Sequence, residues 1–205
     1  MADVLILNPP FVDDFVRSAR WDARSRGRVQ RHPDYLAVAT AVLLEAGIDA
    51  KLVDACAQNW KKADVEALLR REKPAYVVMH AATPSIDNDL AYAALAKEIA
   101  GSKTILVGQH VSAVPEDTFR RSRGALDFIA LGEYDETVRE LVSGGRPEET
   151  RGLCFAGPDG AFKRTPPRPF LDVDKLPFPA WQFIDPNWYY DGGKLHPFLT
   201  LISGR

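Results

Sequence analysis

Two stretches near the start of the chain decide the fold: VLILNPP at residues 4–10 and PDYLAVATAVLLEAGIDAKLVDA at residues 33–55. The first is a short apolar run typical of a buried strand. The second is a helical stretch that ends at Gly47 and continues into another apolar run. The pattern recurs along the chain. Strands are predicted at 4–7, 50–53, 76–79, 104–107 and 126–131, and helices at 34–46, 63–71, 86–99, 116–121 and 133–142.

Five strand–helix units in strict alternation predict a parallel sheet, because parallel strands need crossover helices that cover both faces. The expected fold class is α/β, a Rossmann-like or flavodoxin-like doubly wound sheet of five parallel strands over residues 1–145. Gly101 and Gly144 follow two of the later helical stretches, where a helix C-terminal cap is expected.

The alternation stops after Pro147. Residues 146–165 predict a small β-hairpin, with strands at 152–156 and 161–164 around a Pro-Asp-Gly turn. Residues 157–205 hold eight of the 15 prolines, too many for a regular helix or central strand, and are too rich in aromatic residues for a free linker. We expect residues 166–205 to form an extended strap that packs on a surface, with 197–203 as the opening strand of another domain.

Composition excludes several classes of protein. The 205 residues carry a formal net charge of -2, with a pI near 6.1, which argues against a nucleic-acid or membrane-surface binder. No apolar run approaches the roughly 18 residues of a membrane span. Cys56 and Cys154 stand far apart, so they predict neither a metal cluster nor a disulfide framework, and the cytoplasm is the expected compartment.

Candidate binding residues follow the predicted strands, because ligands of open α/β sheets bind at the carboxyl ends of the strands. The loops there are Asn8-Pro9-Pro10, His80-Ala81-Ala82-Thr83, Gly108-Gln109-His110-Val111-Ser112 and Gly132-Glu133. None contains GxGxxG or GxxxxGK(S/T), so an ordinary dinucleotide or ATP site is not expected. We assign no catalytic residue and no metal ligand.

Individual side chains in these loops leave alternatives open. His110 is either a metal ligand or general base, or a residue that only packs and hydrogen-bonds. Glu133 either contacts a ligand or, with Asp135 and Glu136, complements the positive end of a helix. Asp54 has the place of a ribose-binding carboxylate, but the glycine pattern that accompanies one is absent.

The connection from Pro9 to Pro33 is unusually long for a strand–helix loop. It holds six arginines: Arg17, Arg20, Arg24, Arg26, Arg28 and Arg31. They predict either a contact with an anion or a partner domain, since guanidinium groups pair with phosphate and carboxylate, or a solvated mobile loop.

Five segments in order resemble the N-terminal cobalamin-binding domain of cobalamin-dependent radical S-adenosylmethionine enzymes. They are the two opening stretches, VGQHVSAVPED at 107–117, LDFIALGEYDETVREL at 126–141 and RPFLDVDKLPFPAW at 168–181. In that family the strap leads into a barrel strand and a CxxxCxxC motif, and TLISGR at 200–205 matches the residues before it. The resemblance implies a chain truncated before a barrel that carries a 4Fe–4S cluster and S-adenosylmethionine.

The same resemblance implies cobalamin over the carboxyl ends of the strands, with its nucleotide tail in a slot beside Gly108. Leucine at this position is therefore expected to abolish binding and leave the fold intact. The implied cofactor-binding residues are Asn8, Pro9, Pro10, Ala82, Thr83, Gly108, Gln109, His110, Val111, Ser112, Gly132 and Glu133. Related corrinoid proteins carry DxHxxG after the first strand, but this chain has Asn8-Pro9-Pro10-Phe11, so that loop supplies no lower axial histidine.

By resemblance the parent enzyme is a methyltransferase or an oxidative cyclase like the magnesium-protoporphyrin monomethyl ester cyclase, and this piece alone binds cobalamin without catalysis. The alternative is a non-catalytic flavodoxin-like binding or sensory module, or a corrinoid carrier. A phosphoacceptor receiver would need an acidic cluster where Asn8 stands, and a flavodoxin would need a phosphate loop where Pro9-Pro10 stand.

Overall fold

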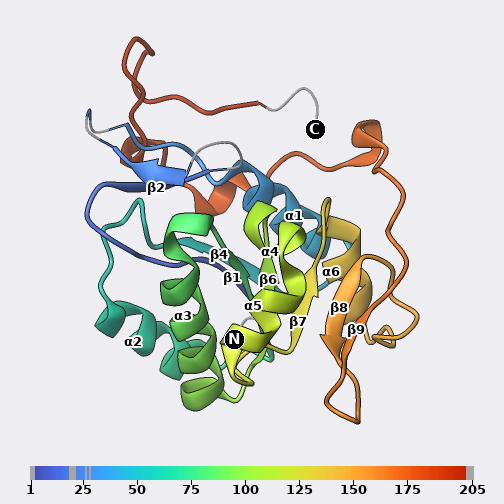
Figure 1. Ribbon diagram of the computed structural model, residues 1–205. Helices are drawn as coiled ribbons and strands as arrows, with labels where there is room; N and C mark the ends of the chain where they lie inside the picture. The colour runs from blue at the N-terminus through green and yellow to red at the C-terminus, as the bar shows by residue number, and fades with distance from the viewer. Residues whose placement is uncertain (1–2, 19–21, 26, 28, 202–205) are drawn as a thin grey trace.

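The computed structural model describes residues 3–18, 22–25, 27 and 29–201. It is built on a seven-stranded sheet of order β4-β1-β5-β6-β7-β8-β9 (Figure 1). Five strands are parallel: β4 (Ala50–Asp54), β1 (Val4–Asn8), β5 (Tyr76–His80), β6 (Lys103–Val107) and β7 (Phe128–Ala130). The predicted doubly wound sheet of five parallel strands is confirmed. The hairpin β8 (Leu153–Ala156) and β9 (Phe162–Arg164) extends it by antiparallel pairing with β7.

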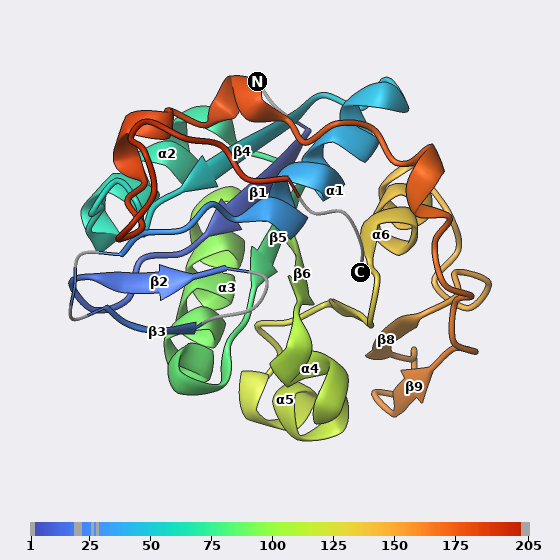
Figure 2. The same ribbon diagram turned by 90° about the horizontal axis from the view of Figure 1, so that it is seen from above.

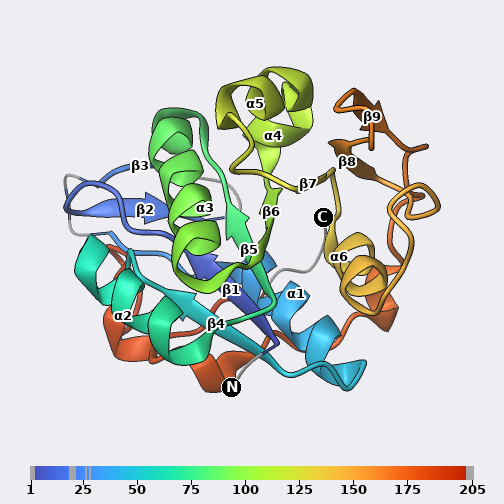
Figure 3. The ribbon, with the colours of Figure 1, turned by 90° about the horizontal axis from the view of Figure 1, so that it is seen from below.

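Helices cover both faces of the sheet (Figure 3). One face carries α1 (Asp34–Glu45) and α6 (Asp135–Val142), and the other carries α2 (Lys62–Glu72), α3 (Ile86–Ala100), α4 (Gln109–Ala113) and α5 (Pro115–Ser122). Side chains of β1 alternate between the two cores, with Val4 and Ile6 on the α1 face and Leu5 and Leu7 on the α2 face. Because both faces are covered, the central strands are apolar throughout instead of alternating with polar residues.

The direction in which successive strands are added to the sheet reverses at β1. Val4 pairs with Ala50 on one side and with Tyr76 on the other, so the chain winds outward in both directions from this strand. The carboxyl ends of β1, β5 and β6 therefore meet at one edge of the sheet, where ligands of such folds bind. This edge holds Asn8, His80 and Val107.

The long arginine-rich connection contains a hairpin that the sequence did not predict. Its strands are β2 (Phe15–Arg17) and β3 (Asp22–Arg24), which pair antiparallel with Arg17 opposite Asp22. Figure 1 shows this hairpin over the end of the sheet where the parallel strands finish. Phe15 and Val16 are buried there, so the hairpin is anchored to the domain and is no free loop.

The proline-rich strap crosses the α1 side of the sheet, as Figure 2 shows in orange and red. It contains three short 3-10 helices: η2 (Val173–Lys175), η3 (Trp181–Phe183) and η4 (Pro186–Trp188). The Ala180 amide donates to the Ala37 carbonyl at 3.0 Å, while Ile184 and Tyr189 are buried in the core. The predicted packing of the strap on a surface is confirmed.

The end of the strap differs from the expected strand. Residues 197–201 form no strand, and residues 202–205 lie outside the described residues. A strand needs a neighbour to accept its backbone hydrogen bonds, and none of the described strands pairs with 197–201. Within the described part of the chain, no helix is both long and apolar enough to span a membrane.

Candidate functional site

A cavity of about 240 Å³ opens at the carboxyl ends of β5, β6 and β7. Its lining residues are Tyr35, His80, Gly108, Gln109, Ser112, Gly132, Glu133 and Tyr134. Five of the predicted cofactor-binding residues, from two loops far apart in sequence, therefore surround one space. The parallel sheet brings them together, because β6 and β7 are neighbours and end at the same edge.

A second cavity of about 360 Å³ shares Ser112, Gly132 and Glu133 with the first. It continues toward the strap, where Arg168 and Phe170 line it. We call the two cavities together the groove. The groove therefore runs from the sheet edge to the start of the strap.

Gly108 occupies a backbone position that only glycine adopts easily, with φ 115° and ψ 179°. An added Cβ would lie 2.9 Å from the Ala81 carbonyl oxygen and 3.2 Å from His80 Nε2. Glycine is thus required where the loop after β6 passes close to the end of β5. Because the Cβ alone would displace backbone, leucine at this position is expected to strain the fold as well as to affect binding.

Ser112 connects the loops that follow β6 and β7. Its Oγ donates to the Gly108 carbonyl at 2.8 Å and accepts a hydrogen bond from the Gly132 amide at 3.0 Å. Gln109 begins α4, and its side chain is exposed at the rim of the groove. The groove therefore has a rigid floor of backbone and hydroxyl groups beside an exposed amide.

The remaining predicted residues of these loops do not line the groove. Ala82 is buried, and Val111 packs into the core on the α2 face. Thr83 is exposed, and its Oγ1 hydrogen-bonds to His110 Nδ1 at 3.1 Å, which links the loops after β5 and β6. His110 thus makes a hydrogen bond through Nδ1. The described residues contain no group of three or more His, Cys, Asp or Glu side chains that could hold a metal ion.

Glu133 lies on the rim of both cavities. Its Oε2 accepts a hydrogen bond from the Leu171 amide at 2.8 Å, which ties the strap to the groove. Asp135 is buried in the first turn of α6, and Glu136 pairs with Arg139 three residues later. The carboxylates at this helix start thus have different structural roles, and Glu133 alone borders the groove.

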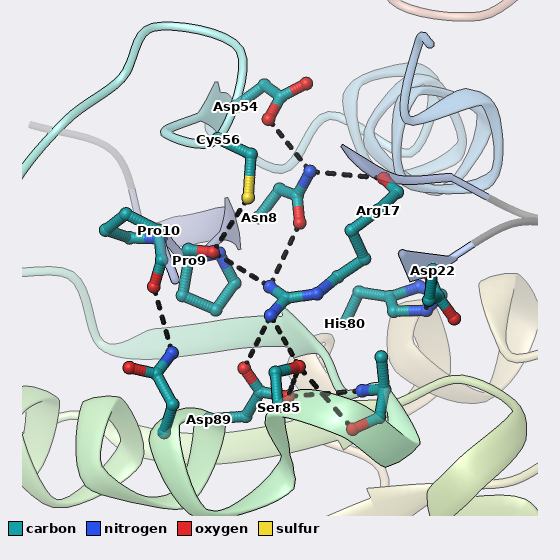
Figure 4. Close-up of polar contacts among 12 residues, drawn as sticks. Asn8, Pro9, Pro10, Arg17, Asp22, Asp54, Cys56, His80, Ser85 and Asp89 are labelled. Carbon is teal, nitrogen blue, oxygen red and sulfur yellow. Dashed lines mark hydrogen bonds and ion pairs between the residues drawn. The ribbon is translucent and has the colours of Figure 1, made fainter. Parts of the chain in front are cut away.

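The predicted residues after β1 lie in a different place, beneath the hairpin (Figure 4). Asn8 is fully buried, and Arg17 is 1% exposed. Arg17 donates from Nη1 to Asn8 Oδ1 at 3.1 Å and to the Pro9 carbonyl at 2.9 Å, and from Nη2 to Asp89 Oδ1 at 2.8 Å. The buried carboxylate at the start of α3 compensates the guanidinium charge, as burial of a charge requires. Asn8 and Pro9 are therefore buried beneath Arg17, and Pro10 is buried next to them, where its carbonyl accepts a hydrogen bond from Asn88 Nδ2 at 2.9 Å.

Asp54 belongs to the same cluster. It accepts hydrogen bonds from Asn8 Nδ2 at 2.8 Å, Tyr189 Oη at 2.9 Å and the Ala57 amide at 3.2 Å. Burial raises the pKa of this carboxyl to about 6, against the opposing effect of these hydrogen bonds. Asp54 thus connects β1, β4 and the strap, and it is not free to bind a ribose.

Neither interpretation of the arginine-rich loop holds for Arg17, which is buried within the chain instead of solvated or offered to a ligand. Arg24 is exposed, and Arg31 lies 3.5 Å from Asp191 of the strap. Arg20, Arg26 and Arg28 lie outside the described residues. The partners of Arg17 come from segments far along the chain, so no local pattern could reveal them.

The predicted cofactor-binding set omitted His80, as it omitted Tyr35 and Tyr134 of the same cavity. His80 ends β5, is only 6% exposed and lines the groove beside Gly108. Burial, aided by the nearby charge of Arg17, lowers the pKa of His80 to about 3, so the imidazole is neutral. Its Nε2 lies 3.9 Å from Asp22 Oδ1 of the hairpin. In the sequence, the one indication of this role was that His80 is a polar residue at the end of an apolar strand.

Comparison with known proteins identifies relatives of this fold. The family described as B12 binding domain matches residues 29–142. The comparison with curated proteins finds no match. The matched segment includes β4 to α6 and therefore both loops that form the groove.

Two solved enzymes have a similar fold. The cobalamin-dependent S-adenosylmethionine radical enzyme OxsB, with aqua-cobalamin and S-adenosylmethionine bound, is 16% identical with a TM-score of 0.68 over 86% of this chain. The radical S-adenosylmethionine methyltransferase TsrM from Kitasatospora setae, with cobalamin and a 4Fe–4S cluster bound, is 14% identical with a TM-score of 0.62 over 81% of this chain. The alignment covers only 24% of OxsB and 31% of TsrM.

Proposed function

The chain belongs to the B12-binding domain family, and from that premise we propose that it binds cobalamin in the groove at the carboxyl ends of β5, β6 and β7. One observation carries the assignment. The groove is bordered by Gly108, where two loops approach so closely that no side chain fits, and by Gly132, where an added Cβ would meet nothing within 4 Å. Neither glycine carries a side chain that could extend into the groove, and the space beside Gly132 is open to a large cofactor.

The polar groups of the groove fit the amide side chains that surround a corrin ring. The Gln109 amide can both donate and accept hydrogen bonds, and the Ser112 hydroxyl can do the same. Tyr35 and Tyr134 add aromatic surface to the lining of the same cavity. Bound cobalamin would supply a cobalt centre that carries and transfers a methyl group, while this chain holds and orients it.

We propose further that the chain is the cobalamin-binding part of a radical S-adenosylmethionine methyltransferase or oxidative cyclase. The proposed division is residues 1–145 for the cofactor, 146–165 for the hairpin and 166–205 for a strap toward a barrel domain. Support comes from the five family-like segments and from the strap residues Phe170 and Phe178, which are 94% and 82% exposed and so available to a covering domain.

The cellular setting is proposed from the chemistry of the side chains. Cys56 and Cys154 are buried free thiols, a state typical of a reducing compartment, and we propose the cytoplasm. The near-neutral charge supports a small-molecule cofactor over a nucleic acid as the ligand.

Titration of the purified chain with hydroxocobalamin, followed by gel filtration and a visible spectrum, tests the assignment. The chain is expected to retain the corrinoid. Gln109→Trp places an indole at the rim of the groove and is expected to abolish retention. Gln182→Trp is the matched control, because this exposed glutamine lies in η3, away from the groove, and retention should be unchanged. Equal retention by both variants would contradict the placement of the cofactor.

A further inference from the structure

Phe170 of the strap is a large apolar side chain that the folded chain leaves almost entirely in solvent. It is 94% exposed, the highest fraction among the large hydrophobic residues that the structure describes, yet it lines the second cavity of the groove. It is also the aromatic residue of that cavity, whose lining is otherwise mostly polar, proline or glycine. Removing such a ring from water is favourable, so a molecule bound in the groove gains free energy by covering it.

The backbone on both sides of Phe170 is attached to the domain. Before it, Arg168 donates from Nε to Thr137 Oγ1 at 2.9 Å and forms an ion pair with a glutamate of α6. After it, the Leu171 amide donates to Glu133 Oε2 at 2.8 Å. The residue between Arg168 and Phe170 is a proline, which fixes one more backbone angle. A ligand that covers Phe170 therefore loses little free energy in ordering this segment.

Phe178 shows that exposure and position at the groove are separate properties. It is 82% exposed and has a proline on each side, so it too is an apolar side chain on a restricted part of the strap. It does not line either cavity of the groove. Phe178 is thus free for a covering domain, whereas Phe170 borders the space proposed for the cofactor.

Aromatic side chains line both parts of the groove. Tyr35 and Tyr134 line the first cavity, Phe170 lines the second, and the two cavities share Ser112 and Gly132 between them. A ligand in contact with both parts has to be large and has to offer apolar surface at each end. A corrin macrocycle, whose edge carries methyl groups as well as amide side chains, meets both requirements.

Resting on the proposed function, we infer that Phe170 is a cofactor-binding residue whose ring packs against the corrin macrocycle of the bound cobalamin at the strap end of the groove. The strap then forms part of the binding site as well as a connection between domains. Glu133 and Arg168 act as positioning residues, because they hold the backbone on either side of Phe170.

The affinity of the chain for hydroxocobalamin tests this contact. Phe170→Ala is expected to raise the dissociation constant about tenfold or more, because burial of a phenyl ring contributes at least that factor. Phe178→Ala is the matched control and should leave the dissociation constant unchanged. Both side chains are exposed in the free chain, so urea unfolding should be the same for both variants. Phe170→Trp keeps an aromatic ring and should retain the affinity.

Fluorine nuclear magnetic resonance locates the ring directly. The chain is labelled with para-fluorophenylalanine and loaded with cob(II)alamin, whose unpaired electron broadens the resonances of nearby nuclei. The Phe170 resonance is the one missing from the spectrum of Phe170→Leu, and Phe178 is assigned in the same way. The Phe170 resonance is expected to broaden with cob(II)alamin and to stay sharp with diamagnetic hydroxocobalamin, while the Phe178 resonance broadens less.

The outcomes separate this contact from the proposed function on which it rests. Corrinoid retained with equal affinity by the unaltered chain and Phe170→Ala, or a Phe170 resonance that stays sharp with cob(II)alamin, would overturn the contact and leave cobalamin binding in place. Equal weakening by Phe170→Ala and Phe178→Ala would also overturn it, because position at the groove would then make no difference. Failure of the unaltered chain to retain the corrinoid would overturn cobalamin binding and the Phe170 contact together.

Discussion

At the carboxyl ends of β1 and β4 the molecule is filled by charged side chains, whereas at the ends of β6 and β7 it is hollow. We call the first region, built on Asn8, Arg17, Asp54 and Asp89, the closed half. The open half is the groove. All five parallel strands present the same backbone at this edge, so the difference lies in the loops that leave the strands. The hairpin β2–β3 covers the closed half. In the open half no hairpin of the described chain lies over the loops, and Gly108, Ser112 and Gly132 add little bulk to the lining.

The largest expected effect of a substitution is in the closed half. Arg17→Leu leaves Asp89 buried without its partner, which should lower the free energy of unfolding by about 3–5 kcal/mol. Urea unfolding followed by circular dichroism measures this loss. Arg24→Leu, an exposed arginine of the same hairpin, is the control, and its effect should stay below about 0.5 kcal/mol. Similar values for the two variants would show that burial of Arg17 does not hold the closed half together.

Gly108→Ala tests the floor of the open half. The new methyl group would meet the Ala81 carbonyl oxygen at 2.9 Å in a conformation reserved for glycine, so we expect a loss of about 2–3 kcal/mol in the free energy of unfolding. Gly132→Ala also has a positive φ but meets nothing within 4 Å, so its loss should be smaller by about 1 kcal/mol or more. Equal losses in thermal unfolding would remove the steric argument for glycine at position 108.

Asp22 lies at the border of the two halves, and burial raises its pKa to about 6. The folded state then keeps this proton at pH values where the unfolded chain has released it. The bound proton therefore stabilises the folded state below about pH 4, and this stabilisation is lost as the pH rises to about 6. Its contribution to the free energy of unfolding is about 1–2 kcal/mol, because the side chain is partly solvated.

Asp22→Asn should therefore make the free energy of unfolding fall less steeply between about pH 4 and 6. Urea unfolding of both proteins across this range gives the difference. Asp54 and Asp89, whose pKa values are also raised by burial, contribute to both proteins and cancel in the comparison. Parallel pH profiles would show that Asp22 is ionised in the folded state.

The smallest expected effect concerns the surface of the closed half. Lys61 Nζ lies 2.8 Å from Asp13 Oδ1, and both side chains are about 70% exposed. Lys61→Ala should change the free energy of unfolding by less than about 0.5 kcal/mol, because water and salt screen the pair. A decrease in the free energy of unfolding as large as that of Arg17→Leu would mean that this exposed ion pair stabilises the closed half as much as the buried one does.

Apart from the strand expected at 197–203, which the described residues 197–201 do not form, the elements predicted from local pattern agree with the structure. The five parallel strands and their helices follow from apolar runs and helical periodicity, which depend on residues close together in sequence. The short helix α4 and the hairpin β2–β3 were not predicted. Both lie in loops whose residues carry weak local preferences, and contacts with distant segments stabilise them.

The candidate site was predicted in part, for the same reason. Residues after β6 and β7 do line one groove, because parallel neighbours end at one edge. Residues after β1 obey the same rule, yet the hairpin covers them. Only the fold shows that Arg17 reaches Asp89, at a separation of 72 residues.

The sequence by itself determined the doubly wound sheet, its helices, the hairpin after it and the position of Gly108, because short-range periodicity and backbone geometry are local properties. Tertiary structure decided which part of the sheet edge is open and that His80 and Asp22 face each other. Those features depend on which side chains surround each buried charged group in the folded chain, and these side chains can come from any part of the sequence.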